Sequence, residues 1–476
     1  MTAQTISMTD DHYQIAARLE RLPVSRWHLR MRYIVGTGLF FDAFDILTIG
    51  YAIPTLISLW GLTTPQIGLL ISIGSVGQML GALFFGWLAE KVGRIPAMVT
   101  TIMVYSIMSL CCAFAWDLQS LLILRFIQGL GLGGESPVTN TYISEFAKAQ
   151  RRARFTLVFQ LVFPAGSLVA AAVGSYVVPH FGWQAIFIIG AIPALVAMPL
   201  RWLVPESPRW LATRGRYAEA DRILTKIEDS ISEQGAKPLP PIPERVPEAP
   251  RSDTNILDLF RGIYLRRTLV IWSLYIGINF ITSTLYGWLP SIYKTVYHVP
   301  VDQALHYGFI TQAANLIGVT VVAFFIDRTG RRPWFVWAFL LGSFSLFFLW
   351  DAGTMDPSHV VIFVSMAAVC CGSVSIAMGM YTAENYPTHL RAIGSGVGAV
   401  VARSASIAGP LLIGLVLNDA GLGAAFVMIA TAPFLAAIVV YFFAAETKGK
   451  TLESLSPPLW NQPTAPEIVP VPARAD

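Results

Sequence analysis

The stretch GWLAEKVGR at residues 86–94 has a counterpart in IDRTGRR at residues 326–332, and each lies between two apolar runs. Two further polar stretches also occur twice and in the same order, YISEFAKAQRRAR (142–154) with YTAENYPTHLRAIG (381–394), and VPESPRW (204–210) with AAETKGKTLE (444–453). The acidic residues of the three pairs are separated by 327 − 90 = 237, 384 − 145 = 239 and 446 − 206 = 240 positions. This near-constant offset predicts that the chain contains one structural unit twice.

The composition indicates a chain that lies mostly within a membrane. Of its 476 residues, 54% are hydrophobic and 13% are charged, and the mean hydropathy is +0.58. Soluble proteins carry roughly 25% charged residues. The net charge of +4 is small, so no nucleic-acid partner is expected. The four cysteines form two adjacent pairs without metal-binding spacing, and we expect neither a metal nor a cofactor.

Twelve apolar runs have the length of about 17–25 residues that a helix needs to span a bilayer. They lie at 33–56, 66–89, 95–116, 118–144, 153–177, 184–204, 268–290, 304–326, 334–351, 358–381, 392–417 and 421–444. Their length and lack of alternation exclude spanning strands. The sequence therefore predicts an all-α integral membrane protein with twelve transmembrane helices in two bundles of six.

The basic residues predict the orientation of these helices. Loops after the odd-numbered runs contain one basic residue, Lys294, whereas loops after the even-numbered runs are rich in lysine and arginine. The positive-inside rule then places both termini in the cytoplasm. We divide the chain into a cytoplasmic segment without a secretory signal (1–32), two bundles (33–204 and 268–444), a proline-rich linker (205–267) and a tail (445–476).

The repeated loop resembles the signature of the major facilitator superfamily. The first copy has Gly86, Glu90, Gly93 and Arg94, whereas the second keeps Asp327, Gly330 and Arg331 but has Ala323 in place of the first glycine. RFIQGLGLGG (125–134), PESPRW and AETKGKTLE resemble the sugar-porter-like branch. FFDAFDILTIGYAIP (40–54) and GLGLGGESPVTNTYISEF (129–146) are similar to niacin-type and aromatic-acid:proton symporters, relatives of the synaptic-vesicle-2 and organic-ion transporters. The double glutamine of sugar porters is missing from GINFITSTLYGW (277–288), which disfavours a hexose.

The cytoplasmic stretches contain acids and bases that could form a ring of ion pairs. We expect pairs of Glu90 with Arg94, Glu145 with Arg154 and Glu206 with Arg209. Their second-half counterparts are Asp327, Arg331, Glu384, Arg391 and Glu446. These pairs would hold the cytoplasmic ends of neighbouring helices together in the outward-facing state of a transporter and part when the inside opens. The alternative is that the charges are solvated and contribute about 0–1 kcal/mol each.

Five ionisable residues lie well inside the spans, where an unpaired charge costs about 2.5–3.5 kcal/mol. They are Asp42, Asp45, Arg125, Glu135 and Arg403. Asp42 and Asp45 share one face of a helix, and two close carboxylates disfavour double ionisation. The resemblance implies that Asp45 and Arg125 form a proton-coupling pair; the alternative is a static pair. Glu135 could contact Asp42 or a substrate, or serve as a structural acid.

Arg403 has no acid near it in the sequence, and a buried guanidinium is suited to binding a carboxylate. Alternatively, it pairs with an acid on another helix, such as Asp42. Further polar or aromatic residues could complete a substrate cavity: Asn140, Gln160, Asn279, Tyr286, Trp288, Asn315 and Tyr381. Most aromatic residues of membrane spans serve packing or the interface.

The sequence favours a secondary transporter of the cell membrane that moves a small organic anion together with protons by alternating access. An aromatic or heteroaromatic carboxylate such as nicotinate is the expected substrate, and a monomer is the expected form. Proton antiport, export, uniport of another solute such as a sugar or an organic cation, and a non-transporting receptor are the alternatives. An enzyme is not expected, because the spans contain no nucleophile–base set, and no GxxxxGK[ST] loop points to ATP.

Overall fold

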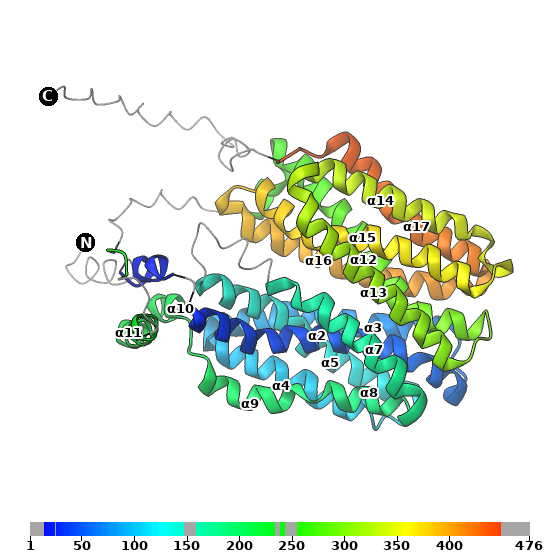
Figure 1. The fold of residues 1–476 in the computed structure, drawn as a ribbon, viewed down its shortest axis with the longest axis horizontal. Helices are drawn as coiled ribbons and strands as arrows, with labels where there is room; N and C mark the ends of the chain where they lie inside the picture. The colour runs from blue at the N-terminus through cyan, green and yellow to red at the C-terminus, as the bar shows by residue number, and fades with distance from the viewer. Residues whose placement is uncertain (1–13, 24, 147–158, 234–238, 243–254, 449–476) are drawn as a thin grey trace.

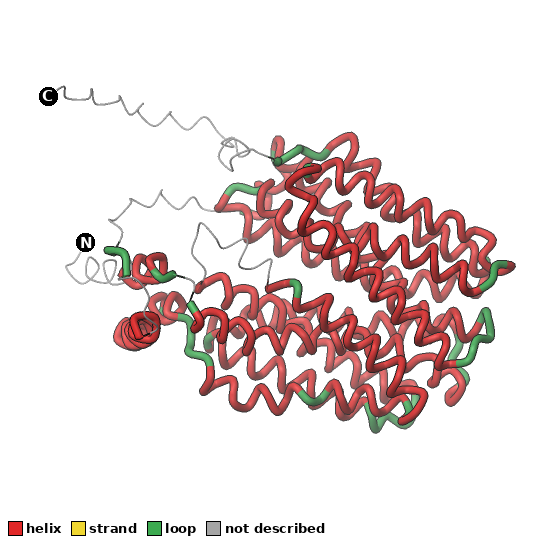
Figure 2. Tube along the Cα trace, in the orientation of Figure 1, coloured by secondary structure: helices red, strands yellow, loops and turns green. Residues whose placement is uncertain are grey.

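The structure is a computed structural model that describes residues 14–23, 25–146, 159–233, 239–242 and 255–448. Across this part of the chain all regular elements are helices (Figure 2). The first group comprises α2 (Arg26–Trp60), α3 (Thr64–Val92), α4 (Arg94–Cys112), α5 (Leu118–Phe146), α7 (Val162–Phe181), α8 (Trp183–Gly190) and α9 (Pro193–Leu203). Two short helices, α10 (Pro208–Thr213) and α11 (Tyr217–Glu233), and the 3-10 turn η2 (Ile256–Phe260) follow. The second group comprises α12 (Gly262–Thr295), α13 (Val301–Thr329), α14 (Arg331–Phe347), η3 (Phe348–Thr354), α15 (Pro357–Asn385), α16 (Thr388–Asp419) and α17 (Gly421–Phe443).

Ten of the described helices are long and apolar enough to cross a membrane. The two other predicted spans correspond to α5 and to the pair α8 and α9. Helix α5 is less apolar because it contains Arg125, Glu135 and several glycines. The sixth predicted span is interrupted by a turn at residues 191–192, so that it forms two helices and not one. For the described residues the all-helical prediction is confirmed, and ten of their helices are able to span a membrane by length and composition.

Glycines with positive φ separate two pairs of consecutive helices. Gly93, with φ of 112°, lies between α3 and α4, and Gly330, with φ of 95°, lies between α13 and α14. A side chain strains this backbone conformation, so glycine allows the chain to turn there within one residue. The repeated sequence stretch thus forms the same tight turn in both halves.

The helices form two groups that lie side by side (Figure 1). Within the first half, α3 and α4 pack against α5, and α2 packs against α7. Within the second half, α13 packs against α15, and α14 and α12 pack against α17. The halves meet where α3 contacts α16, α7 contacts α13 and α2 contacts α12. Figure 1 shows α10 and α11 beyond one end of the bundle, which we call the linker end; the other is the opposite end.

The closest backbone approach between the halves lies towards the opposite end. A Cβ on Gly68 of α3 would lie 2.6 Å from the Pro410 carbonyl oxygen of α16, and one on Gly50 of α2 would lie 2.7 Å from the Tyr286 carbonyl oxygen. The Ser72 hydroxyl donates a hydrogen bond across the same interface to the carbonyl of Ile407, at 2.9 Å. Small residues let these helices approach closely, as is common in membrane proteins.

A short helix at 14–21 packs on α11 at the linker end. Its apolar residues, including Ile15 and Leu19, are buried in one cluster with Leu224 and other residues of α11. Arg18 and Arg21 both pair with Glu228, at 2.8 and 2.7 Å. The segment before the first span therefore packs against the helices that follow the sixth.

Candidate functional site

Four of the five intramembrane charges lie on α2 and α5 of the first half. Asp42 and Asp45 of α2 are buried, and so are Arg125 and Glu135 of α5. Helix α2 is the first long apolar helix, and it packs beside α5 and α7. The spacing of three places both aspartates towards α5, where they contact Ser136 and Gln128 respectively.

Asp45 and Arg125 are joined by an amide. The Gln128 amide nitrogen donates to Asp45, and the Gln128 amide oxygen accepts a bond from Arg125 at 2.8 Å. Asp45 also accepts a hydrogen bond of 3.2 Å from Ser109 of α4. The expected contact between Asp45 and Arg125 is therefore bridged and not a direct ion pair, because Gln128 lies one helical turn after Arg125 and offers both a donor and an acceptor.

Two glycines make room for these charged groups. A Cβ on Gly74 of α3 would lie 3.2 Å from the Arg125 guanidinium, and one on Gly190 of α8 would lie 2.9 Å from the Asp45 carboxylate. The chain thus leaves open the space that the side chains of Asp45 and Arg125 occupy.

Glu135 is held inside the first half by two hydroxyl groups. Thr101 of α4 donates to one carboxylate oxygen at 2.8 Å, and Thr139 donates to the other at 2.9 Å. The carboxylate lies against Gly38 of α2. These contacts are those of the structural alternative for Glu135, and among the described residues no hydrogen bond joins Glu135 to Asp42.

Asp42 and Arg403 face each other across the interface between the halves. Asp42 accepts a hydrogen bond of 2.9 Å from Ser136, while its second oxygen, Oδ1, is buried and has no hydrogen-bond partner among the described residues. Arg403 of α16 donates to the side chain of Gln78 on α3, and it attracts Asp42 electrostatically. The middle of the interface therefore contains a cation and a carboxylate with one unused acceptor.

The other predicted cavity residues are dispersed. Gln160 donates to Asn140 at 3.0 Å, and Asn279 donates to the Tyr275 carbonyl of its own helix at 2.9 Å. The Trp288 indole donates to the Pro410 carbonyl at 3.1 Å, and Asn315 packs against Gly372. Tyr286 lines a pocket between the halves that is separate from Arg403. The structure therefore brings only some of these residues to the interface.

Tyr381 lies at the linker end, away from Arg403. Its hydroxyl donates to the Ala445 carbonyl at 2.9 Å, just as Tyr142 donates to the Pro205 carbonyl at 2.6 Å. Tyr381 is thus the counterpart of Tyr142 in the repeated unit, and its hydroxyl ties α15 to the segment after α17. In this structure the Tyr381 hydroxyl is engaged at the linker end, and its predicted place in a substrate cavity stays a prediction.

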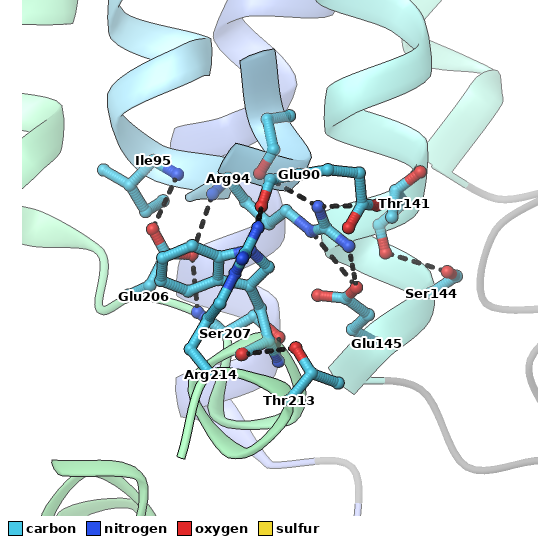
Figure 3. Close-up of polar contacts among 12 residues, drawn as sticks. Glu90, Arg94, Ile95, Thr141, Ser144, Glu145, Glu206, Ser207, Thr213 and Arg214 are labelled. Carbon is cyan, nitrogen blue, oxygen red and sulfur yellow. Dashed lines mark hydrogen bonds and ion pairs between the residues drawn. The ribbon is translucent and has the colours of Figure 1, made fainter. Parts of the chain in front are cut away.

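The linker end of the first half has a compact set of charges (Figure 3). Arg94 pairs with Glu90 and with Glu145, each at 2.9 Å. The carboxylate of Glu206 accepts hydrogen bonds from the backbone N–H groups of Arg94 and Ile95, each at 3.1 Å. Because these N–H groups begin α4, a carboxylate there satisfies donors that lack a partner within the helix.

The second half repeats this arrangement. Arg331 pairs with Glu384 at 3.2 Å, and Glu446 accepts from the backbone N–H groups of Arg331 and Arg332 at 3.1 and 3.0 Å. These contacts all join helices of the same half. In this structure the linker-end ion pairs are present at the same time as the close contacts between the halves at the opposite end.

Several expected pairings at the linker end are corrected. Glu206 binds backbone donors, and Arg209 pairs with Glu20 at 2.9 Å, so the predicted Glu206–Arg209 pair is replaced. Arg391 donates to the Tyr386 carbonyl at 3.4 Å. Arg154 and the side chain of Asp327 lie outside the described part of the chain. The predicted pairs differ from the observed ones because they were chosen among residues close in the sequence, whereas a partner such as Glu20 comes from a segment far from Arg209 in the chain.

The matched glutamates differ in acidity. Burial raises the pKa of Glu206 and outweighs its backbone hydrogen bonds. Burial also opposes ionisation of Glu446, but the N–H groups of Lys448, Arg331 and Arg332 outweigh it and lower the pKa. Both effects follow from the balance between desolvation and hydrogen bonding to the charged form.

Sequence reasoning missed Gln128 and Gln78, which bind Arg125 and Arg403. Both are amides inside apolar runs, and this signal was available in the sequence. Among the residues that the structure describes, no three His, Cys, Asp or Glu side chains are arranged to hold a metal ion. The chemistry that remains is proton exchange at buried carboxylates and binding of an anion at the half-buried guanidinium of Arg403.

Known proteins that are similar to this chain are membrane transporters of one family. The family described as "Sugar (and other) transporter" matches residues 14–458. The niacin transporter NiaP of Acinetobacter baylyi is 34% identical over 446 residues, covering 93% of this chain and 99% of that protein. The gallate transporter of Pseudomonas putida is 28% identical, covering 89% and 93%. The 4-hydroxybenzoate transporter PcaK of Acinetobacter baylyi is 26% identical, covering 87% and 91%.

Solved structures share the fold. The crystal structure of a D-xylose–proton symporter superposes with a TM-score of 0.71 at 19% identity, covering 89% of this chain and 99% of that one. The inward-open conformation of the xylose transporter XylE from E. coli gives 0.70 at 18% identity, covering 90% and 99%.

Proposed function

Because the chain belongs to the sugar (and other) transporter family of the major facilitator superfamily, we propose that it carries a small organic anion across the cell membrane together with protons. The family resemblance seen in the sequence is thereby confirmed, and the chain is a multi-pass membrane transporter. The substrate class and the coupling to protons are the content of the proposal.

Arg403 is the observation that carries the proposal. Its guanidinium lies at the middle of the interface between the halves, where it donates to the neutral amide of Gln78 and faces Asp42. A guanidinium has five N–H donors in a planar fork, which matches the two oxygens of a carboxylate. An organic anion would satisfy donors that Gln78 leaves free, and it would compete with Asp42 for the same cation.

The relatives support the choice of anion. Niacin, gallate and 4-hydroxybenzoate, which the names of three relatives give as their substrates, are all aromatic acids. A carboxylate on a flat ring combines a charge for Arg403 with an apolar body for the helices around it. We therefore propose a single-ring aromatic or heteroaromatic carboxylate.

The bridge of Asp45, Gln128 and Arg125 supports proton coupling. Ionised Asp45 accepts the Gln128 N–H, which in turn orients the amide oxygen towards Arg125. Protonation of Asp45 removes the negative charge that strengthens the hydrogen bonds from Asp45 through Gln128 to Arg125, because a charged acceptor makes the stronger bond. Protonated and ionised Asp45 would thus favour different packings of α2 against α5, which is the bistable element that coupling requires.

We further propose that the linker end faces the cytoplasm and that the bundles 33–204 and 268–444 rock around Arg403. The basic residues of the repeated stretches lie at this end, in agreement with the positive-inside rule. The closest contacts between the halves lie towards the opposite end. This conformation then corresponds to the state with its outer side closed.

Radiolabelled uptake into proteoliposomes with an imposed pH gradient tests the proposal. We expect [14C]nicotinate or [14C]benzoate to accumulate when the outside is acidic, and Arg403→Gln to lower the initial rate at least about tenfold through loss of a charged hydrogen bond of about 1.5–3 kcal/mol. Arg216→Gln, a change at an exposed arginine of the linker, is the control. Uptake that does not depend on the gradient and stops once the solute has equilibrated would indicate uniport, and equal rates in both variants would contradict the role of Arg403.

A further inference from the structure

A groove opens on the surface of the first half between the start of α2 and the end of α9. It is lined by Trp27, Arg30, Met31 and Ile34 of α2, by Leu203 of α9 and by Pro205. Among the described residues that line it, Arg30 alone is charged. The groove therefore combines apolar walls with one cationic group.

The positive charge at this groove has no counter-charge within the described part of the chain. Arg26 and Arg30 are exposed and lie one helical turn apart on the same face of α2. Neither guanidinium forms a hydrogen bond or an ion pair with a described residue, and the first turn of α2 contains no acid. Like charges at this spacing repel each other, and the helix dipole adds positive potential at the N-terminus. An external anion would relieve both effects.

Exposed apolar side chains surround the two arginines. Tyr33, on the same face of α2, is 70% exposed, and Trp202 and Leu203 at the end of α9 are 80% and 44% exposed. Tryptophan and tyrosine gather where a membrane meets water, because one end of each side chain is apolar and the other is polar. Free guanidinium groups beside exposed aromatic and aliphatic side chains suit an amphipathic anion.

The length of α2 places this end of the helix among lipid headgroups. The helix has 35 residues, which corresponds to about 52 Å at 1.5 Å per residue, whereas the hydrocarbon layer is ~30 Å thick. An arginine without a partner is costly in hydrocarbon, so the end that begins at Arg26 extends into the headgroup layer. The phosphate groups of the lipids lie at this level, next to the ends of their acyl chains.

We infer that this groove is a binding site for an anionic glycerophospholipid. The phosphodiester accepts hydrogen bonds from Arg30 and Arg26, because a guanidinium binds phosphate oxygens in bidentate fashion. One acyl chain lies along Ile34 and Leu203 while the headgroup stays outside, so the site needs no enclosed cavity. A zwitterionic lipid has the same phosphate but also an ammonium group, which the two arginines repel. The site therefore selects lipids with a net negative charge, independently of the proposed transport function.

Native mass spectrometry of the purified full-length chain in a non-ionic detergent tests the site, because it resolves each bound lipid. Dioleoyl phosphatidylglycerol and dioleoyl phosphatidylcholine are the probes, since they share their acyl chains and differ in net charge. We expect phosphatidylglycerol to bind more tightly, and Arg30→Gln to weaken its binding about tenfold through loss of charge-assisted hydrogen bonds. Phosphatidylcholine binding should change by less than about twofold. Arg222→Gln, at an exposed arginine of α11 outside the groove, is the matched control.

Equal affinity of the wild type for the two lipids would overturn the inference, as would an equal loss of phosphatidylglycerol binding in Arg30→Gln and Arg222→Gln. Arg26→Gln provides a second variant if Arg30→Gln fails to fold, and it should also weaken phosphatidylglycerol binding. Glycerol 3-phosphate separates a lipid from a soluble phosphate ester. We expect it not to displace phosphatidylglycerol, and displacement at a similar concentration would show that the acyl chain contributes nothing and that the occupant is not a lipid.

Discussion

At the scale of single residues, the buried charges are connected through uncharged amides. Gln128 links Asp45 to Arg125, and Gln78 holds Arg403. An amide has a donor and an acceptor, so it can pass a change in the charge of an acid to the orientation of a guanidinium. A direct ion pair inside a bilayer is harder to break, because each separated charge would be left in a medium of low dielectric constant. The bridge offers a smaller barrier between the two states.

Replacing Gln128 tests the bridge. We expect Gln128→Leu to leave Asp45 and Arg125 each short of one hydrogen bond, which costs about 1–3 kcal/mol per unsatisfied group. Thermal stability in detergent and gradient-driven uptake should both fall. Gln119→Leu, at an exposed position near the start of the same helix, is the control. Retained uptake with full dependence on the pH gradient would show that the bridge is not needed for coupling.

At the scale of elements, the repeated stretch is a helix-capping device. Glu206 and Glu446 each accept two backbone N–H bonds at the start of α4 and α14. A negative group at a helix N-terminus is favourable because of the helix dipole. The arginine that begins each helix, Arg94 or Arg331, then binds the acid at the end of α5 or α15. Three helix ends are thereby fixed in each half.

We expect substitution by alanine to affect stability very differently at Gly93 and at Gly86, the two glycines of the repeated stretch in the first half. Gly93→Ala places a methyl group against Glu206 and Trp210 at a φ of 112°, and we expect a loss of at least about 1–2 kcal/mol in stability. Gly86→Ala meets nothing within 4 Å, and alanine already stands at 323 in the second copy. Thermal unfolding of the two variants provides the comparison. A larger loss for Gly86→Ala would contradict this account of the turn.

The contact between the helix at 14–21 and α11 should depend on pH. Burial opposes ionisation of Glu228, but hydrogen bonds from Arg18 and Arg21 outweigh it and lower its pKa. A lowered pKa means that the stabilisation is present above the unfolded value of about 4.3 and is lost as pH falls through the folded value. We expect the hydrogen-exchange protection of residues 14–21, taken relative to the intrinsic rate at each pH, to fall below about pH 4 and, in Glu228→Gln, to be reduced already at pH 7. Unchanged protection in Glu228→Gln would refute the contribution of these pairs.

Some of this could be predicted from the sequence and some could not. The helices were predictable because long apolar runs have one solution in a bilayer, and the buried charges stood out because each is costly there. The break at residues 191–192 does have a local signal, Gly190 before it and Pro193 after it, which an assignment based on the apolar run alone did not use. Partners such as Gln128 for Asp45, or Glu20 for Arg209, depend on how distant helices pack. Neutral amides also give a weaker sequence signal than charges do.

At the scale of the whole molecule, the two halves converge towards the opposite end. Gly50 and Gly68 meet the backbone of α12 and α16, and Tyr51 reaches Gly308 of α13. The contacts of the repeated charges remain within each half. Movement of one half against the other would therefore break the glycine contacts and the Ser72–Ile407 hydrogen bond, while leaving both sets of linker-end ion pairs intact.

A reversible cross-link between the halves tests this division. Cysteines at 72 and 407, in a chain whose four native cysteines are replaced by alanine, place two thiols at the contact that now joins Ser72 to the Ile407 carbonyl at 2.9 Å. A short, reducible thiol cross-linker should abolish uptake, because alternating access requires this interface to open. Reductant should restore uptake, and each single cysteine treated alike is the control. Cross-linked protein that transports at the full rate would show that the halves need not separate here, and that the substrate path lies elsewhere than along the interface that holds Arg403.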